Sequence, residues 1–343
     1  MSEANPGRAR SGAPTLQDVA REAGVSLATA SRVLNGTARR VAPAFREKVE
    51  AAAEQLGYSA NLSAQATARG SSAIVALLVA DIADPYFGRI AAGVARGADE
   101  AGLLLTIAIT ERDQQREAKL VRALRGQRPR SVILAASRTS GRANEELVAE
   151  LGAYTSAGGS VVTIGPGGGT RSVGVDNVGG GRALGAALAG LGYRRAVFVA
   201  AEEGVRTSDD RVAGFTEGFG AGGGAVDEIV RAGFSRDAGH DAIAGIAERI
   251  EAGTVIVGVS DVVAMGVMAA LREHGRAPGQ DVAVAGFDDI PTSHDAVPGL
   301  TTVHVPLEEL GYRALRSSLD AAVHDDEPLP VEVVLRGSTP ARG

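Results

Sequence analysis

The spacing of apolar residues predicts three short helices near the start of the chain. The first helix carries apolar residues along one face, at Leu16, Val19, Ala20 and Ala23. Gly24 ends this run, and Ser26 is placed to cap a second helix that continues through Leu34. Pro43 suits the first turn of a third helix, which Gly57 ends. The buried face of this third helix is predicted to hold Phe45, Val49, Ala52, Ala53 and Leu56.

Beyond Gly70 the pattern changes to apolar strands that alternate with amphipathic helices. The predicted strands are 74–79, 103–109, 132–135 and 161–164, then, after a Gly-rich stretch at 165–169, 196–200, 254–259 and 282–286. Short apolar runs separated by helices are typical of βαβ units and parallel sheets. Two such sheets in succession predict a cleft between them, at the carboxyl ends of strands where α/β proteins bind ligands.

Length and composition fit a globular protein of two or three domains. The chain has 343 residues, of which 45% are hydrophobic and 22% charged. It has no cysteine, which excludes disulfides, thiolate nucleophiles and Cys-ligated metal sites and favours a reducing compartment. Residues 1–14 lack the apolar segment of a secretory signal, and the longest uncharged run, 151–170, is rich in Gly and contains Pro166. We therefore expect a cytoplasmic protein that begins with a disordered tail.

Charge is divided unevenly along the chain. The formal net charge is -6, yet residues 1–70 hold nine Arg or Lys and six Asp or Glu, so this segment carries +3 and the remainder -9. A basic head on an acidic body is the asymmetry expected when one module meets a polyanion and the other does not.

Residues 15–36 have the form of a helix-turn-helix. An ordinary helical hairpin is the alternative, because short helix pairs with Gly turns are common. Against that alternative, the second helix is predicted to expose Thr29, Ser31, Arg32 and Asn35. Small polar residues and Arg suit phosphate oxygens and guanine edges. The following segment 61–70 has mostly small, uncharged residues and would be marginal as a free helix.

Eight motifs occur in the order and spacing of one known family. They are TLQDVAREAGVS, ATASRVLNG, REKVEAAAEQLGY, DPYF, RVAGF, SDVVAMG, GFDDIP and LTTVHVP. Over residues 15 to about 338 the chain resembles the lactose/galactose repressor (LacI/GalR) family of transcription regulators. The resemblance implies an all-α, lambda-repressor-like helix-turn-helix domain and an α/β core of two parallel-sheet subdomains, like that of periplasmic binding proteins.

Domain boundaries follow from this resemblance. It implies a DNA-binding domain at 15–60, a hinge helix and linker at 61–72, and an effector-binding core at 73–338. Within the core, the implied N-subdomain covers about 73–172 and 303–325. The implied C-subdomain covers about 173–302 and 326–338.

The resemblance also assigns DNA-binding residues. Leu27, Ala28 and Arg32 would reach base edges in the major groove, with Arg32 placed to bind guanine and the other two offering apolar contact. The implied phosphate contacts are Thr15, Leu16 through its backbone, Ser26, Thr29, Ser31 and Asn35.

The hinge departs from the family pattern. Asn61 to Ala68 matches a helix that folds on operator DNA and inserts a leucine into the minor groove. Thr67 stands where the family has this leucine, and Ala60 stands where it has a proline. Because a β-branched polar residue is a poor wedge, we expect a shallower DNA kink. Ala42 replaces a Ser cap, which predicts a frayed start to the third helix.

In the core, the resemblance implies an effector site. Arg211 would donate hydrogen bonds to ligand oxygens, Asp288 would accept them, and Ser260 takes a position often filled by Asn. Tyr86 and Phe87 would offer an apolar face to a sugar or base ring, with Asp84 nearby. For any one of these residues the alternative is a surface ion pair or a packed aromatic ring, but their joint match to the motifs favours a site. Val305 and Leu307 replace a frequent Gln and an aromatic residue, which predicts a drier site.

No pattern supports catalysis, a metal or a cofactor. The stretch GFGAGG at 218–223 satisfies G-x-G-x-x-G, but it follows a predicted helix rather than a strand, and we interpret it as a loop. Neither a Walker loop nor a nucleophile elbow occurs. The five histidines, His240, His274, His294, His304 and His324, are scattered without metal-ligand spacing.

These observations predict a homodimeric repressor that binds a pseudo-palindromic operator and responds to a small ligand, which we expect to be a sugar. Past Arg336 the sequence GSTPARG holds no leucine heptad, which favours a dimer over a tetramer. The alternative is a cytosolic sugar sensor whose helical head contacts a protein. Salt distinguishes the two, because DNA binding weakens steeply with ionic strength.

Overall fold

The computed structural model describes residues 14–34, 41–59, 71–135, 144–165, 170–320, 322–323 and 327–342. The chain forms two compact units, divided between Ser72 and Ala73. The predicted hinge helix, Asn61 to Ala68, which includes Thr67, lies outside the described residues, as does Asn35.

The first unit contains the three predicted helices. They are α1 (Leu16–Glu22), α2 (Leu27–Leu34) and α3 (Pro43–Leu56). Thr15 and Asp18 form a capping box, in which the Thr15 backbone N–H donates to the Asp18 carboxylate over 3.0 Å. Gly24 has a φ of +64°, which permits the tight turn between α1 and α2. The buried core is made of small side chains at Val19, Ala20, Ala23, Ala30, Val33, Val49, Ala52 and Ala53.

The prediction that Phe45 belongs to the buried core of this unit is wrong. Phe45 is 47% exposed, although it lies on the same helical face as buried Val49. It occupies the first turn of α3, one turn before the point where the helices pack together. Ala42 precedes α3 and provides no side-chain hydrogen bond to its start, and the fraying of this helix stays a prediction.

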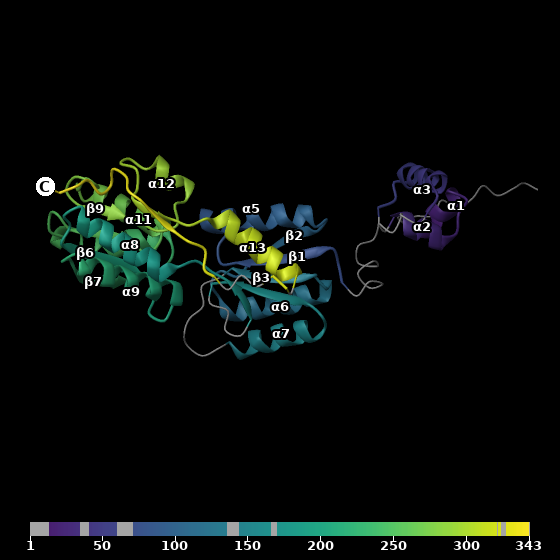
Figure 1. Cartoon of the computed structure of the whole chain (residues 1–343), viewed down its shortest axis with the longest axis horizontal. Helices are drawn as coiled ribbons and strands as arrows, with labels where there is room; N and C mark the ends of the chain where they lie inside the picture. The colour runs from purple at the N-terminus through teal and green to yellow at the C-terminus, as the bar shows by residue number, and fades with distance from the viewer. Residues whose placement is uncertain are drawn as a thin grey trace, which may run out of the picture. The chain divides into compact units, whose positions relative to one another are not determined.

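The second unit consists of two α/β lobes. The first lobe has a parallel sheet of order β2-β1-β3-β4-β5. Its strands are β1 (Ile74–Val79), β2 (Leu104–Ile109), β3 (Ser131–Ala135), β4 (Ser160–Ile164) and β5 (Arg171–Val173). Helices α5 (Pro85–Glu100) and α13 (Leu307–Leu319) cover one face, and α6 (Gln114–Gln127) and α7 (Glu145–Ser156) cover the other (Figure 1).

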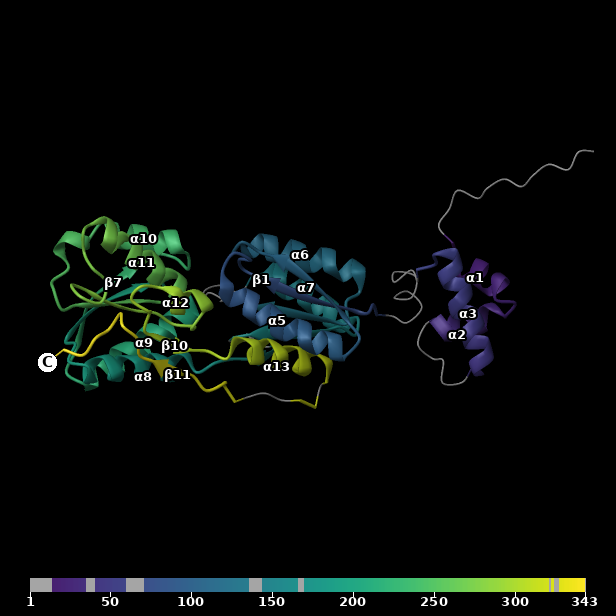
Figure 2. The ribbon, with the colours of Figure 1, turned by 90° about the horizontal axis from the view of Figure 1, so that it is seen from above.

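The second lobe has a parallel sheet of order β7-β6-β8-β9. Its strands are β6 (Arg195–Ala200), β7 (Ala225–Arg231), β8 (Val255–Gly258) and β9 (Ala283–Ala285). The pair α8 (Asn177–Gly190) and α9 (Arg206–Ala221) lies on one side, and α10 (Arg236–Ala244) and α11 (Asp261–Glu273) lie on the other (Figure 2). Two short helices complete it, the 3-10 helix η2 (Ala247–Arg249) and α12 (Pro291–Asp295).

The chain passes between the lobes three times: after β5, after β10 and between α13 and β11. β10 (Thr302–His304) and β11 (Glu332–Val334) form an antiparallel pair beside β9. The predicted class of a helical head and two parallel-sheet subdomains is therefore confirmed. No helix among the described residues is long and apolar enough to cross a membrane.

The loop interpretation of residues 218–223 is wrong for its first four residues, which belong to α9. A Cβ on Gly218 would lie 2.0 Å from the carbonyl oxygen of Arg182, and one on Gly214 would lie 2.0 Å from that of Val178. These glycines allow α9 to pack closely against α8, because any larger residue would collide with the α8 backbone.

Candidate functional site

A buried ion pair lies at the centre of the predicted effector site. Arg211 on α9 donates through Nη2 to Oδ1 of Asp288 over 2.8 Å, and both side chains are 5% exposed or less. Nε of Arg211 donates to Oδ1 of Asn177 over 2.9 Å, and Nη1 donates to the backbone oxygen of Val259 over 2.8 Å. The guanidinium carbon lies 3.8 Å from the centroid of the Phe287 ring. Arg211 thus joins the start of α8, the end of β8 and the loop after β9.

Asp288 is held in an unusual backbone conformation. Its φ is +114°, which residues other than glycine seldom adopt. The backbone is fixed by β10: the Asp288 N–H donates to the oxygen of Val303 over 2.9 Å, and the Val305 N–H donates to the oxygen of Asp288 over 3.4 Å. Such conformations persist when neighbouring structure supports them, often at functional sites.

The electrostatics of this pair are set by burial. Burial raises the pKa of Asp288 to about 7, even though Arg211 acts to lower it, and the negative charge of Asp84 adds to the rise. The Asp288 carboxyl group is therefore poised to change its charge near neutral pH.

Asp84 and Tyr86 of the first lobe lie close enough to the Arg211–Asp288 pair to interact with its charges. Asp84 caps α5 by accepting a hydrogen bond from the Tyr86 N–H over 3.0 Å, and burial raises its pKa. The charges of Arg211 and Asp288 act on Tyr86, although these residues belong to the second lobe. Groups predicted from three separate motifs are thus gathered where the two lobes meet.

The two aromatic residues differ in availability. Tyr86 and Phe87 form an edge-to-face pair with centroids 5.0 Å apart. Phe87 is only 4% exposed and belongs to the hydrophobic core, whereas Tyr86 is partly buried. Val305 and Leu307, the two apolar replacements, are 2% and 3% exposed. They therefore pack inside the protein beside the connection to α13.

The sequence did not predict two acidic residues, Asp261 and Asp289, that lie beside the predicted effector site. Ser260 is the N-cap of α11, and the next residue, Asp261, is fully buried. The Asp261 carboxylate accepts from the Ile290 N–H over 3.0 Å and from the Thr302 hydroxyl over 2.5 Å. Burial, together with the charge of Asp288, raises the pKa of Asp261 well above its usual value. Asp261 thereby ties the loop that carries Asp288 to β10, which its sequence position after a cap gave no reason to expect.

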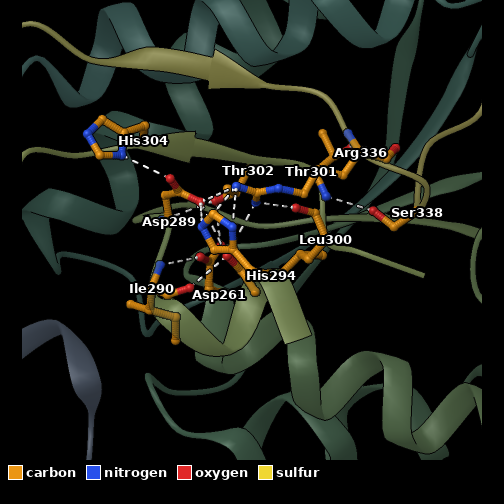
Figure 3. Close-up of polar contacts among 11 residues, drawn as sticks. Asp261, Asp289, Ile290, His294, Leu300, Thr301, Thr302, His304, Arg336 and Ser338 are labelled. Carbon is orange, nitrogen blue, oxygen red and sulfur yellow. Dashed lines mark hydrogen bonds and ion pairs between the residues drawn. The ribbon is translucent and has the colours of Figure 1, made fainter. Parts of the chain in front are cut away.

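Asp289 is the second missed residue, and Figure 3 shows the polar cluster around it. Its carboxylate accepts from Nη2 of Arg336 over 2.7 Å and contacts Nδ1 of His304 at 2.9 Å and Nε2 of His294 at 3.2 Å. The histidines are therefore not all scattered, since two of them meet at one carboxylate. Among the described residues, no three His, Asp or Glu side chains form a group that could hold a metal ion.

The predicted DNA-binding residues that the structure describes lie at the start of α1 and along α2. Leu27 is 47% exposed, Ala28 and Arg32 are exposed, and Ser31 is partly buried. The hydroxyls of Ser26 and Thr29 lie 2.8 Å apart, and Ser26 accepts from the Thr29 N–H over 3.1 Å, which caps the helix. Thr15 caps α1 and is exposed, and Leu16 is partly buried. Leu27 in the first turn of α2 and Arg32 in its last turn are both exposed, and they offer an apolar group and a guanidinium group for base contacts.

Two family models match the chain. Residues 15–61 match the bacterial regulatory proteins of the lacI family, and residues 186–339 match a periplasmic binding protein-like domain. The chain is similar to the transcriptional regulator CelR of Thermobifida fusca, with 31% identity over 94% of this chain and 95% of that protein. It is also similar to the regulator DegA of Bacillus subtilis, with 29% identity over 95% of this chain and 98% of DegA.

Two solved structures are similar to this chain over nearly its whole length. The lac repressor dimer bound to operator and an anti-inducer has a TM-score of 0.83 and 26% identity, covering 96% of this chain and 100% of that chain. A complex of CelR with cellobiose has a TM-score of 0.66 and 29% identity, covering 95% and 99%. These likenesses span both the helical head and the two lobes. The chain therefore belongs to the lacI family of bacterial regulatory proteins, which makes it a DNA-binding transcription regulator and not an enzyme.

Proposed function

We propose that this protein is a homodimeric repressor whose affinity for a pseudo-palindromic operator is controlled by a neutral sugar bound beside Arg211 and Asp288. The observation that carries the proposal is the buried Arg211–Asp288 pair at the meeting point of the lobes. A ligand that touches groups of both lobes favours one relative orientation of the lobes over another, and such couplings amount to roughly 1–3 kcal/mol.

The chemistry of the site favours a polyhydroxyl ligand. Oδ1 of Asp288 is bound to Arg211, and among the described residues Oδ2 has no hydrogen-bond partner, so it can accept a hydrogen bond from a hydroxyl group. Arg211 uses three of its five N–H donors within the protein. Neighbouring acceptors and donors suit neighbouring sugar hydroxyls, which both donate and accept. Relatives point the same way, since one is a ribose operon repressor and another binds cellobiose.

The proposed DNA contacts are those of the head. Arg32 would read a guanine edge, and Leu27 and Ala28 would make apolar base contacts. In the core, Ser260, Asp84 and Tyr86 would serve the ligand site, and Phe87 would support the Tyr86 ring from the hydrophobic core. The proposed phosphate contacts are Thr15, Leu16, Ser26, Thr29, Ser31 and Asn35. Asn61 and Thr67 are the proposed DNA-binding residues of the hinge, with Thr67 at the position of the minor-groove wedge. The similar lac repressor structure, a dimer on its operator, supports this mode of binding.

The edge of the first sheet supports a dimer. β2 is an edge strand, and it exposes Leu104 (57%) and Ile107 (40%). An apolar edge strand is unfavourable in water unless another surface covers it. We expect Leu104→Lys to shift the protein toward monomers in sedimentation analysis and to weaken operator binding.

The function is tested by selecting duplexes from a random library and measuring affinity for the selected sequence at several salt concentrations. If about six or more phosphates are neutralised, affinity falls about a thousandfold or more between 50 and 200 mM salt. A thermal-shift screen of sugars and purines then tests the ligand class, because a ligand at 100 times its Kd adds roughly 2.7 kcal/mol of stability. Stabilisation by a purine but by no sugar would contradict the proposed ligand.

A further inference from the structure

Two consecutive residues beside the proposed ligand site have positive φ angles. The φ of Asp288 is +114°, and that of Asp289 is +56°. Asp tolerates the left-handed region near +60°, but the angle of Asp288 lies outside that region. Such a conformation persists only where neighbouring contacts hold the chain in place.

Backbone N–H groups hold the residues on either side of Asp289. The Asp288 N–H donates to the oxygen of Val303 over 2.9 Å. The Ile290 N–H donates to the carboxylate of Asp261 over 3.0 Å. The Asp289 N–H has a longer contact, 3.4 Å, with a threonine hydroxyl on β10. The backbone therefore holds Asp289 less firmly than it holds its two neighbours.

The side chain of Asp289 supplies the stronger contacts. Its Oδ1 accepts from Nη2 of Arg336 over 2.7 Å and from the Ser293 hydroxyl over 3.3 Å. Its Oδ2 lies 2.9 Å from Nδ1 of His304. Because a carboxylate only accepts hydrogen bonds, His304 carries a proton on Nδ1 and donates it. Figure 3 shows His304 and Arg336 pointing toward the Asp289 carboxylate.

The partners of Asp289 are themselves held by other contacts. Nη1 of Arg336 donates to the backbone oxygen of Leu300 over 2.8 Å, and the Arg336 side chain is 15% exposed. His304 is the last residue of β10 and lies opposite Glu332 in the ladder with β11. The Asp289 carboxylate is therefore bound to groups that hydrogen bonds fix within the second lobe.

We infer that Asp289 is a positioning residue of the proposed ligand site, because its side-chain contacts keep the Asp288 carboxyl group against Arg211. The two aspartates share one planar peptide unit. If the Asp289 side chain is released, this unit is free to rotate, and Asp288 can relax from +114° to a common φ. Its carboxyl group would then move away from Arg211. The inference rests on the proposed function, since it treats Asp288 as a ligand-binding residue.

Two substitutions separate position from charge. Asp289→Asn removes a negative charge and Arg336→Gln removes a positive one, and both break the ion pair. A purely electrostatic influence on Asp288 would shift its pKa down in the first variant and up in the second. Loss of positioning would instead expose the Asp288 carboxyl group in both variants, so that its pKa falls toward the ordinary value of 3.8 in both. Asp227→Asn is the matched control, because Asp227 on β7 pairs with Arg195 over 2.8 Å in the same lobe.

The first measurement needs no ligand. Melting temperatures of the full-length protein are measured with and without Asp288→Asn between pH 4 and pH 8, in the wild type and in each of the three variants. In the wild type and in Asp227→Asn, the effect of Asp288→Asn should change with pH, because burial raises the pKa of Asp288. In Asp289→Asn and Arg336→Gln, most of this change with pH should be lost. The same pH profile in all four backgrounds would overturn the inference.

Isothermal titration with cellobiose, ribose and glucose measures the consequence for the site. The Kd of a sugar that binds the wild type should rise about fivefold or more in Asp289→Asn and Arg336→Gln and stay within about twofold in Asp227→Asn. Equal Kd values for the wild type and Asp289→Asn would overturn the role of Asp289 and leave the proposed function standing. If none of the sugars binds the wild type, the proposed ligand class fails, and the melting series still decides whether Asp289 positions Asp288.

Discussion

Asp288 and Asp289 are adjacent in the chain, yet their carboxylates enter different ion pairs: Asp288 binds Arg211 over 2.8 Å, and Asp289 binds Arg336 over 2.7 Å. The division follows from two consecutive positive φ angles, +114° and +56°. Asp288 faces the proposed ligand site. Asp289 instead links His304, at the end of β10, to Arg336, which follows β11. The two carboxyl groups also differ in pKa. Burial raises the pKa of Asp288, whereas for Asp289 burial is outweighed by hydrogen bonds from Arg336 and His304, which lower the pKa.

Asp288→Asn should gain stability relative to the wild type as pH rises. Burial raises the pKa of Asp288 to about 7 in the folded protein, whereas the carboxyl group of the unfolded chain has the ordinary value of 3.8, so the folded state binds more protons between these pH values. The wild type therefore loses stability from this group between those pH values, by on the order of a few kcal/mol at most. Melting temperatures of the wild type and Asp288→Asn between pH 4 and pH 8 measure the difference. A constant difference over this range would show that Asp288 has an ordinary pKa.

Asp289→Asn should show the opposite dependence on pH. The folded pKa of Asp289 is below its usual value, so its ionised form stabilises the protein above about pH 4, and this contribution is lost as pH falls through the lower folded value. The variant should be less stable than the wild type at neutral pH, and the gap should narrow toward pH 3. The same melting series measures it. A gap that widens in acid would contradict the assigned ion pair.

Gly218 and Gly220 test the packing of α8 against α9. At Gly218 a Cβ would collide with the Arg182 backbone, whereas at Gly220 it would meet nothing within 4 Å. Gly218→Ala should therefore destabilise the core by roughly 1–3 kcal/mol through overpacking. Gly220→Ala, on the same helix, should stabilise it by about 0.5–1 kcal/mol because Ala has the better helix propensity. Urea denaturation of both variants provides the comparison, and a loss of equal size at both positions would refute the packing account.

Arg32→Ala should separate base reading from phosphate contact. If Arg32 reads a guanine edge, its loss should cost about 1–3 kcal/mol on the selected operator and little on random DNA. Fluorescence anisotropy with both duplexes measures the two losses, and Arg21→Ala on α1 serves as a basic control with a local partner in Asp18. Equal losses on operator and random DNA would show that Arg32 holds only phosphate.

The pattern of apolar residues was enough to predict an element such as a strand that is buried along its whole length. β1 is a run of six apolar residues with five fully buried positions, and its predicted bounds are those observed. β7 was missed because it is an edge strand that alternates exposed and half-buried residues, including Asp227 and Glu228. β10 and β11 have three residues each, too few to give a periodic signal.

Errors in side-chain placement had a common physical origin. The burial of Phe45 depends on which helices reach the first turn of α3, and helical periodicity does not contain that information. Asp261 and Asp289 acquire their partners through β10 and the segment after β11, which lie far along the chain from β8 and β9. By contrast, Arg211, Asp288 and Asp84 were identified from family motifs, and the structure places all three within electrostatic range of one another.

The central claim is that ligand bound at the Arg211–Asp288 pair controls operator affinity. Its most direct test is the Kd of the full-length protein for the selected operator duplex, measured by fluorescence anisotropy with and without the sugar that stabilises the wild type in the thermal-shift screen. We predict that the sugar changes the wild-type Kd by about 5-fold to 150-fold and leaves that of Asp288→Asn nearly unchanged. An operator Kd that does not respond to the bound sugar, or an Asp288→Asn variant that responds like the wild type, would contradict the claim.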